Sequence, residues 1–568
     1  MNLNILKPIA WILMICLLVI TSQNQATSQS SFFNRTHPFT QNIDRFDVIY
    51  HLDHNIHLAY KRIAREDILN SSNTLDTASI TPLDRHDIQK IKRAQEDFDN
   101  YRNNKGILKY FYKDPAHLFQ VQTESFSLTL NALLNIKLGY ESESDEIIFH
   151  NGRGIELYGS LDNKLYFYTA LMENQSNFFN YQEPFIEEFS TIRGQGNFKT
   201  YQSRVINNLS GFDYARATAY FGINVSKHTK LELGHDRHFI GHGMRSLLLG
   251  DEGPNYFFLK FDVNVWKIHY QTIFAELSTT SAKFTSGDIL LPKKYMATHY
   301  FSFKPSKKFE LGFFESIVFA RENNFELQYL NPIIFYRTVE FQLDSPDNVL
   351  LGLNLKWHAA KGVSLYGQIM LDEFSAREIF SSRQWWGNKY GLQGGVKYYN
   401  MFGIDHLDIQ LEHNRVRPYT FSHRVASEEF PNITVSNFSH SFQPLAHPLG
   451  ANFTETIVRL RYQITPNWQI EPRLILTKVG RDDDANYGSN LIKPDATRIA
   501  NFGITQNQGL VSDISMLHVN SSLRLFHGAY LDVDFILRND LNQSLGDTRT
   551  LYFGTGFRYN FSTHHIDY

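Results

Sequence analysis

The sequence predicts an all-β fold, a transmembrane antiparallel β-barrel of about 16–18 strands with a small N-terminal helical or irregular region. Three observations favour it. From about residue 121 onward, apolar and charged side chains alternate with the period of two that strands require. Short polar turns alternate with long polar segments, which is typical of outer-membrane barrels. Beyond residue 30, no window of 18 residues is apolar and uncharged, so no transmembrane helix is predicted.

Composition excludes several classes of protein. The 568 residues contain 55 Lys and Arg and 58 Asp and Glu, a net charge of −3, so no nucleic-acid partner is predicted. Cys16 is the only cysteine and lies in an N-terminal apolar run. If that run is cleaved, the mature chain has no thiol, which excludes disulfide frameworks, cysteine-ligated metals and a cysteine nucleophile. No cofactor is predicted.

Residues 1–26 are predicted to be a cleaved signal peptide for export towards the outer membrane. Lys7 is the only charge before the continuous apolar stretch of residues 9–20, and a polar segment follows. These twelve residues would rise about 18 Å as a helix, too short for a hydrocarbon core of about 30 Å. An uncleaved anchor remains the alternative.

Residues 27–120 are predicted to form an N-terminal periplasmic or plug-like region of helical or irregular structure. Thr81-Pro82 begins a sequence with Ile88, Ile91 and Phe98 near helical spacing, which predicts a helix. The stretch 44–69 is ambiguous, and part of it can be helical. We expect this region at the periplasmic mouth of the barrel or inside it.

Residues 121–568 are predicted to form the outer-membrane β-barrel. In the segment 363–372, Val363, Leu365, Ile369 and Leu371 fall on one face, and Ser364, Gln368 and Asp372 fall on the other. The segments 407–412, 458–464 and 531–535 alternate in the same way. Charged strand faces are costly in a dry core but normal in a water-filled lumen. A large soluble β-sandwich, propeller or β-rich enzyme remains the alternative.

The connections divide into two kinds. Short turns are predicted at 304–308, 358–362, 400–405, 465–467 and 526–529, and long loops at 174–212, 278–294, 374–390, 417–451 and 480–512. Aromatic residues near strand ends suit interfacial girdles; they are Tyr398, Tyr399, Trp468, Phe526, Tyr530 and Phe561. The chain finishes on an alternating segment with the terminal aromatic Tyr568, which is typical of outer-membrane barrels.

Three stretches differ from generic barrel strands: ELGHDRHFIGHGMRSLLLGDEGPNYFFLKF (232–261), LQYLNPIIFYRTVEFQLDSPDNVLLGLNLKWH (327–358) and WWGNKYGLQGGVKYYN (385–400). Together they resemble the Wzi-type capsule-assembly outer-membrane protein family, closest to RemB-like gliding-motility proteins. The resemblance implies a non-enzymatic barrel involved in capsule or surface-polysaccharide assembly or attachment, or in gliding motility. It implies outer-membrane lipid, surface polysaccharide, and gliding or envelope proteins as partners.

Candidate contacts for a polysaccharide or an anion come from these stretches and from the segment that follows. Arginine can bind acidic sugar or phosphate groups through paired hydrogen bonds. For the first cluster, a lumenal salt-bridge network with Asp236, Asp251 and Glu252 is the competing interpretation. Arg415 and Arg417 share strand parity, and for these two the competing interpretation is a charged barrel rim. The seven candidates are Arg237, His238, His242, Arg245, Arg337, Arg415 and Arg417.

No catalytic residue and no metal site are predicted. His235, His238 and His242 do not have zinc-site spacing, and on a strand His235 and His238 would face opposite ways. The sequence has no GxSxG, Walker A or Rossmann motif in the required context. Two alternative functions remain open: a general porin or solute channel, and an exported β-rich carbohydrate hydrolase.

Overall fold

The structure is a computed structural model. It describes residues 32–35, 37–53, 55–64, 80–93, 117–162, 164–203, 210–280, 292–321, 324–333, 335–345, 347–423, 435–542, 544, 546–561 and 567. The predicted signal peptide lies outside these residues. Within the described ranges, no helix is both long and apolar enough to cross a bilayer.

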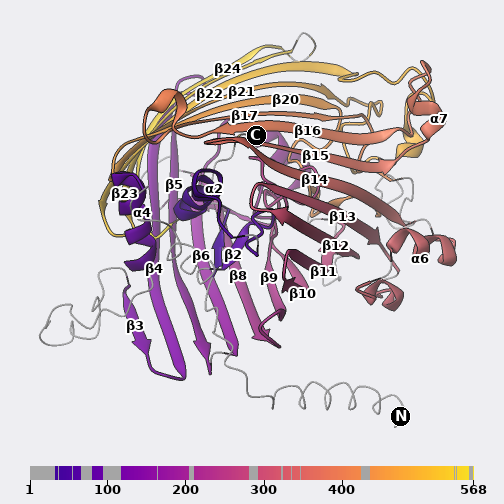
Figure 1. Cartoon of the computed structure of the whole chain (residues 1–568). Helices are drawn as coiled ribbons and strands as arrows, with labels where there is room; N and C mark the ends of the chain where they lie inside the picture. The colour runs from indigo at the N-terminus through magenta and orange to yellow at the C-terminus, as the bar shows by residue number, and fades with distance from the viewer. Residues whose placement is uncertain are drawn as a thin grey trace, which may run out of the picture.

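Antiparallel strands close into one barrel (Figure 1). Two short strands, β3 (Phe119–Gln122) and β7 (Lys199–Gln202), extend the edges of longer neighbours. The other 18 strands form the ring, which closes where β24 pairs with β4 and Tyr559 lies opposite Leu134. This confirms the predicted antiparallel β-barrel, at the upper end of the expected strand number.

The ring strands are β4 (Phe126–Glu141), β5 (Glu146–Leu161), β6 (Leu165–Ser176), β8 (Ser210–Asn224), β9 (Thr229–Asp236), β10 (Tyr256–Val265), β11 (Ile268–Ser278), β12 (Lys293–Ser306), β13 (Phe309–Phe319), β14 (Asn348–Ala360), β15 (Val363–Glu373), β16 (Lys389–Tyr398), β17 (Leu407–Val416), β20 (Phe453–Thr465), β21 (Trp468–Arg481), β22 (Leu510–Phe526), β23 (Ala529–Leu541) and β24 (Thr548–Tyr559). Strands β18 (Ser439–His440) and β19 (Gln443–Pro444) form a separate small hairpin. Short helices lie in the connections: α5 (Glu183–Phe189), η3 (Leu327–Leu330), α6 (Tyr336–Leu343), α7 (Ala376–Ile379), η4 (Met401–Gly403) and η5 (Asp495–Thr497).

The two faces of the wall follow the predicted alternation. On β15, Leu365 and Ile369 are exposed on the outside, whereas Ser364, Gln368 and Asp372 are buried inside. The apolar exterior suits lipid, and many polar groups of the interior find hydrogen-bond partners within the lumen. The polar face of β15 therefore points into the barrel, as a membrane barrel requires, although a few charged residues such as Arg153 of β5 lie on the outer face.

Most short turns lie at one end of the barrel and all the long connections lie at the other, as predicted; the β4–β5 turn is a short one at the second end. The short-turn end carries exposed aromatic residues that form an outer girdle: Trp266, Trp357, Phe402, Trp468 and Phe526. Three of the girdle residues predicted from the sequence were wrong. Tyr399 is buried, and the Tyr530 ring lies against Arg558 and lines a cavity. Phe561 packs against a buried cluster and lines another lumenal cavity. Both tyrosines have the parity of the lumenal face.

The N-terminal region contributes α2 (Pro38–Tyr50), α4 (Pro82–Arg93) and a two-stranded sheet of β1 (Phe32–Asn34) and β2 (Arg62–Ala64). Helix α2 begins after His37, whose side chain accepts the Phe39 N–H, and has proline at its first position. The predicted helix at Pro82 is confirmed through Arg93; residues 94–116 are outside the described ranges.

Helix α2 lies inside the ring of strands (Figure 1) and is held by ion pairs to the lumenal face. Arg45 Nη1 lies 2.6 Å from an Asp408 carboxylate oxygen, and Lys356 Nζ lies 2.6 Å from Asp47. Lys397 pairs with Asp44 at 3.0 Å. These wall residues lie near the short-turn end, so α2 closes that part of the lumen. We call residues 37–64 the plug.

Strand β24 confirms the predicted alternating segment as far as Tyr559, whereas the predicted terminal aromatic Tyr568 lies outside the described residues. Strand β24 ends at Tyr559, and Asn560 takes a left-handed conformation with φ 50°. Farther along, Asp567 is buried in the lumen, where its carboxylate lies 2.7 Å from Arg245 Nη2. Asp567 thereby adds a carboxylate to the charged groups of the lumen.

Candidate functional site

The connection between β9 and β10, residues 237–255, folds into the lumen; we call it the lumenal loop. Ile240, Leu247, Leu248 and Leu249 are completely buried in the main apolar cluster. The Gly241 N–H donates to the Ala59 carbonyl at 2.7 Å, so the loop meets the plug directly.

Polar side chains of the wall hold the lumenal loop by its backbone. Gln368 accepts the Leu247 N–H at 2.8 Å and donates to the Ile240 carbonyl at 3.0 Å. Glu412 accepts the N–H groups of Met244 and Arg245 at 2.7 and 3.0 Å. Sequence alternation predicted that these wall residues face inward, but no local signal identified their partners.

A second inward segment, residues 435–452, packs against the lumenal loop. The Gly250 N–H donates to the Leu445 carbonyl at 2.7 Å, and a Cβ on Gly250 would lie 2.3 Å from the Ala446 oxygen. Lys294 from β12 donates to the Asn437 carbonyl at 2.9 Å. The two segments and the plug together occupy much of the lumen.

Four predicted site residues lie on the lumenal loop. Arg237 donates to the Gly253 carbonyl at 3.0 Å, and His238 Nδ1 lies 3.1 Å from the Tyr256 hydroxyl. Burial lowers the pKa of His238 and of His242 well below the usual value, so both are neutral at pH 7. Arg245 pairs with Asp567 and lines a cavity.

The other three predicted residues lie elsewhere and do not join this cluster. Arg337 is exposed on α6 and pairs with Glu340 at 2.6 Å. Arg415 is on the outer face of β17, where Nε donates to Gln506 at 3.3 Å. Arg417 follows the end of β17 at Val416 and is buried, with Nε donating to the Asn388 carbonyl at 2.9 Å. The structure therefore does not build one site from all seven.

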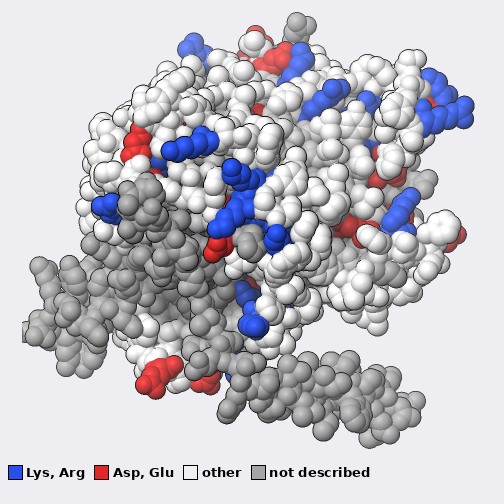
Figure 2. All heavy atoms as spheres, in the orientation of Figure 1, with Lys and Arg blue, Asp and Glu red and all other residues white. Residues whose placement is uncertain are grey.

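A cationic cavity of about 90 Å³ lies where the lumenal loop, the plug and the wall meet. Carboxylates of Asp44 and Glu252 also line it, and Asp567 bridges Arg245 and Arg473 beside it. In the space-filling view, Lys and Arg gather around the position of α2 in Figure 1 (Figure 2). The cations that line the cavity are Arg35, Lys61, Arg245, Lys397, Arg459 and Arg473.

A larger cavity of about 180 Å³ lies between the β4–β8 side of the wall, the β6–β8 connection and strands β22–β24. Aromatic rings line it: Phe179 meets Tyr552 edge-to-face at 5.0 Å, and Phe178 stacks on Tyr214. Its amides are Asn135, Asn174, Asn177, Gln182 and Gln195. Asp567 also lines this cavity, so it lies between the two.

Several polar groups along the larger cavity lack hydrogen-bond partners among the described residues. Three buried atoms make no hydrogen bond there: Asn135 Oδ1, His150 Nε2 and Gln195 Oε1. Arg216 points inward and contacts the Met172 sulfur at 3.6 Å, but pairs with no described carboxylate. Native proteins rarely leave such groups unpaired, and each of these three atoms has almost no accessible surface, so a polar ligand or water reaches them only if the side chains turn.

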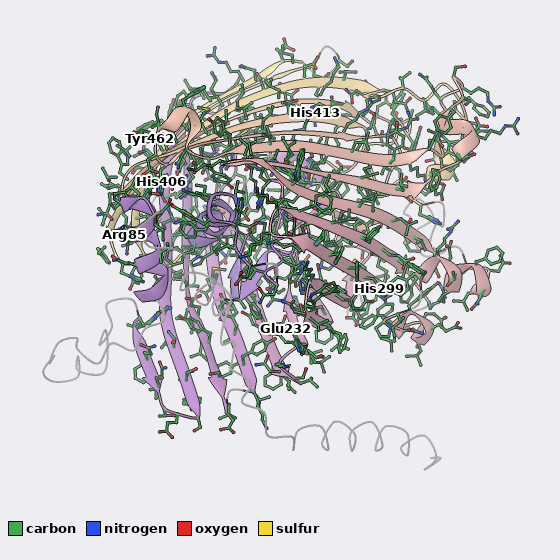
Figure 3. All side chains as sticks on the ribbon, in the orientation of Figure 1. Arg85, Glu232, His299, His406, His413 and Tyr462 are labelled. Carbon is green, nitrogen blue, oxygen red and sulfur yellow. The ribbon has the colours of Figure 1, made fainter. Side chains whose placement is uncertain are left out.

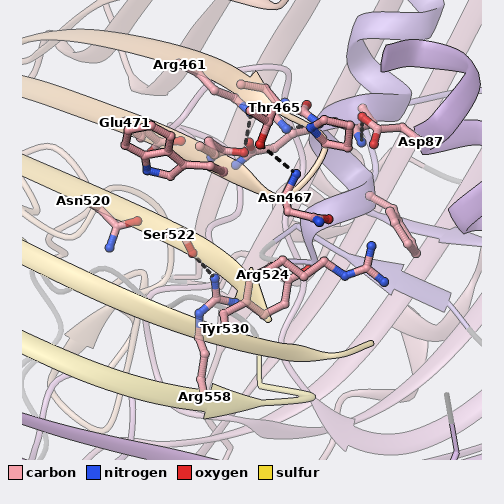
Figure 4. A pocket seen from close by; sticks show the side chains of 17 residues that line it. Asp87, Arg461, Thr465, Asn467, Glu471, Asn520, Ser522, Arg524, Tyr530 and Arg558 are labelled. Atoms are coloured by element: carbon pink, nitrogen blue, oxygen red, sulfur yellow. Dashed lines mark hydrogen bonds between the residues drawn. The ribbon is translucent and has the colours of Figure 1, made fainter. Parts of the chain in front are cut away.

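A third cavity, of about 100 Å³, opens at the short-turn end (Figure 4). It is lined by Arg461, Arg524 and Arg558, and by Asp87 from α4. Arg558 lines the larger cavity as well, and it donates to the Ser522 hydroxyl at 2.8 Å. Arg558 therefore joins the third cavity to the larger one, and Asp567 lies between the larger cavity and the cationic cavity.

One cluster has the composition of a metal site. Ligand atoms of Asp84, Asp405 and His406 lie within 4.8 Å of one another, next to the N-terminal helices (Figure 3). Arg45 already pairs with both carboxylates, and His406 Nε2 lies 3.1 Å from Asp84. A guanidinium in that position supplies the positive charge that a metal would bring, so the cluster fits an ion-pair network better.

Comparisons with known proteins agree on the fold. The model of the capsule assembly protein Wzi family matches residues 189–535. The solved structure of Wzi from Escherichia coli, described as an outer membrane protein involved in group 1 capsule assembly and a carbohydrate-binding β-barrel, has a TM-score of 0.58 and 12% identity. That match covers 94% of this chain and all of the E. coli chain.

Weaker similarity extends to other barrels. OprD from Pseudomonas aeruginosa has a TM-score of 0.41 and 10% identity, over 76% of this chain and 94% of that protein. OpdK from the same species has a TM-score of 0.42 and 9% identity, over 76% of this chain and 98% of that protein. No curated protein sequence matches this chain.

Proposed function

Because the chain belongs to the family of the capsule assembly protein Wzi, we propose that it binds an acidic surface polysaccharide, with the larger lumenal cavity as one binding site. The chain is an outer-membrane β-barrel of a capsule-assembly family. The single observation that carries the proposal is a lumenal cavity with aromatic rings, unpaired polar atoms and an arginine without a described acidic partner.

The lining of the cavity suits a sugar ring. Aromatic faces such as those of Tyr214 and Tyr552 offer flat apolar surface for the C–H face of a sugar. Asn135, His150 and Gln195 line the cavity, and their buried unpaired atoms can meet hydroxyl groups once the side chains turn toward it. A mainly apolar pocket with a few placed polar groups is the usual form of a small-ligand site.

The charges of the cavity favour an acidic sugar. Lys137 is matched by Asp534 at 3.3 Å, whereas Arg216 has no described carboxylate partner. A sugar carboxylate would pair with this guanidinium through charge-assisted hydrogen bonds. The adjoining cationic cavity, to which Arg245 belongs, extends the same preference for anions along the lumen.

The E. coli relative is described as carbohydrate-binding, and the proposal carries this property over to the present chain. We assign the short-turn end to the periplasm, as in other outer-membrane barrels, and the ion pairs of α2 near that end support a periplasmic-mouth position for this helix. The barrel acts without catalysis in this proposal. The inward segments and the plug argue against a general porin, because they occupy the lumen.

Binding of defined oligosaccharides tests the site. Purified protein in detergent is titrated calorimetrically with hexagalacturonate, an acidic probe, and with maltohexaose, a neutral one. We expect tighter binding of the acidic probe, and a loss of about tenfold to a hundredfold in Arg216→Ala, because a charged hydrogen bond contributes about 1.5–3 kcal/mol. The matched control is Arg153→Ala, on the outer face of β5, where the guanidinium is half exposed. Equal affinity of Arg216→Ala and wild type for hexagalacturonate would refute the assignment.

The RemB-like gliding role implied by the sequence resemblance is a finer proposal about the same barrel. A deletion strain scored for capsule retention and for surface spreading separates the two roles. Loss of spreading with normal capsule favours motility. Loss of capsule with normal spreading favours polysaccharide assembly or attachment.

A further inference from the structure

The connection between β13 and β14 lies outside the barrel wall, unlike the lumenal loop. Residues of its helices η3 and α6 pack against outward-facing residues of β12–β14, and α6 lies near the ends of β13 and β14 (Figure 1). The wall residues beneath them have the parity of the lipid-facing side: Val349 is in line with Leu351 and Leu353, which are exposed. We call residues 324–345 the outer cover. Its buried core consists of Tyr295, Ala297, Ile317, Phe319, Tyr329, Tyr336, Val339 and Val349.

The outer cover shields polar groups on the outward face of the wall. Glu315 is buried there and accepts the Arg337 N–H at 3.2 Å. The His299 ring lies 4.1 Å from that of Tyr336, and the Tyr270 hydroxyl donates to the Pro332 carbonyl. Charged groups on the lipid face of a barrel are destabilising near the middle of the bilayer. The cover therefore removes a carboxylate from a surface that would otherwise meet lipid.

The opposite side of the outer cover exposes large apolar side chains, interspersed with exposed polar ones such as Gln328, Arg337 and Gln342. Relative exposures are 72% for Leu327, 87% for Ile333, 71% for Phe335 and 86% for Phe341. Large exposed apolar patches on proteins mark contact with a partner or a membrane. Four such side chains within one short segment far exceed the scattered apolar residues of ordinary surfaces.

This apolar surface is continuous with the lipid-facing wall. Glu315, under the cover, pairs in register with Leu351, and the next outward pair is Phe313 with Leu353. Phe313, Leu351 and Leu353 are all exposed on the outside. The edge of the outer cover therefore lies one outward-facing residue pair away from side chains on the lipid-facing wall. For this reason we identify membrane lipid as the partner of the apolar surface. The exposed guanidinium of Arg337 on the same helix can reach the headgroup level.

We propose that η3 and α6 are immersed in the outer leaflet of the membrane, where Leu327, Ile333, Phe335 and Phe341 contact lipid chains. The barrel then presents a wider lipid-facing surface over β12–β14 than its strands alone provide. This inference concerns a surface separate from the lumenal site and does not depend on the proposed glycan binding.

Quenching of a site-specific fluorophore tests the depth of the outer cover. In a Cys16→Ser background, which has no other cysteine, Ile333→Cys and Phe341→Cys are labelled with bimane in the full chain reconstituted into phosphatidylcholine vesicles. Leu353→Cys on the wall is the lipid control, and Lys361→Cys in an exposed short turn is the water control. We expect spin-labelled lipid to quench the labels at 333 and 341 as strongly as the label at 353. We expect iodide to quench the labels at 333 and 341 as weakly as it quenches the label at 353.

Quenching by iodide at the level of Lys361→Cys would overturn the proposal. So would protection from both quenchers together with cysteine crosslinks between two copies, because a second copy would then cover the surface. Folding of each labelled variant is checked by heat-modifiable gel mobility. Leu327→Cys replaces any variant that fails this check, so the depth of the cover is measured in either case.

Discussion

At the scale of single residues, Asp47 is the side chain on which docking of the plug depends most. Its carboxylate is buried between Lys304 at 3.3 Å and Lys356 at 2.6 Å. Removing one partner of a buried ion pair leaves the other charge without compensation, which costs about 3–5 kcal/mol. We expect Asp47→Asn to release the plug, detected as faster proteolytic cleavage within residues 37–64.

The matched control for this prediction is Asp53→Asn. Asp53 also joins the plug to a wall lysine, Lys307 at 2.8 Å, but the two side chains are 43% and 49% exposed. Exposed pairs contribute about 0–1 kcal/mol, so cleavage should stay near the wild-type rate. Equal cleavage of both variants would contradict the role given to Asp47.

Two adjacent glycines on β16, Gly394 and Gly395, are expected to respond differently to substitution by alanine. A Cβ on Gly395 would lie 2.2 Å from the Tyr366 ring, whereas a Cβ on Gly394 meets nothing within 4 Å. Tyr366 donates to Glu412 at 2.9 Å, and Glu412 holds the lumenal loop. Overpacking costs about 1–3 kcal/mol, so Gly395→Ala should lower the temperature of the heat-modifiable gel shift. An equal fall in Gly394→Ala would show that the ring contact is not the cause.

The sequence predicted the orientation of these residues but not their partners. Strand alternation correctly placed Asp408, Gln410 and Glu412 on the lumenal face. What each of them binds depends on segments far away in sequence: Arg45 binds Asp408 from 363 residues upstream. Period two is a local signal, and it carries no information about contacts across the lumen.

At the scale of elements, the docking of α2 should resist mild acid. Burial by itself raises the pKa of Asp44 and of Asp47, but the adjoining lysines lower both values far below the ordinary 3.8. Each carboxylate therefore stabilises the docked plug fully above about pH 4, and this contribution is lost as the pH falls through the lowered values. Burial also lowers the pKa of His57 to about 3, so it stays neutral near pH 6.

The measurement is hydrogen exchange of the α2 amides, corrected for intrinsic rates, between pH 7 and pH 3. We expect constant protection down to about pH 4 and a decline below it. A decline that begins between pH 7 and pH 5 would mean that a histidine controls docking instead of the carboxylates. In Asp47→Asn, protection should be low throughout this range.

The lumenal loop and the outer cover, the two connections that flank β10–β13, show what the sequence could not predict about elements. Residues 232–261 stood out for glycine, histidine and arginine, yet the triplet Leu247–Leu249 reaches the core only because wall side chains accept the loop backbone. The segment 327–358 stood out equally, but α6 packs outside the wall. Both contain apolar and charged residues, and only the tertiary arrangement decides which side of the wall each one covers.

At the scale of the whole molecule, the alternation and the order of short and long connections sufficed for the fold. They are set by the membrane itself, since every strand must present an apolar face to lipid and pair both of its edges. The lumenal cavities were not predictable, because they are the spaces left between the wall, the plug and two inward segments. Arg216 and His150 illustrate this: nothing in their local sequence marks them as neighbours of one cavity.

Because the lumen is filled, we predict that the wild-type barrel conducts few ions. Barrels of 16–18 strands are wide enough for an aqueous channel, so the ring alone would conduct. Here the lumenal loop contacts the plug through Gly241 and the second inward segment through Gly250. We expect no steady current from the wild-type protein in planar bilayers, and larger current when residues 239–251 are replaced by a short glycine-serine linker.

Replacing residues 375–387, a segment of equal length with exposed apolar side chains around α7, should leave the bilayer current unchanged. Steady conduction by the wild type, or equal conduction by both replacements, would mean that the lumenal loop does not close the barrel.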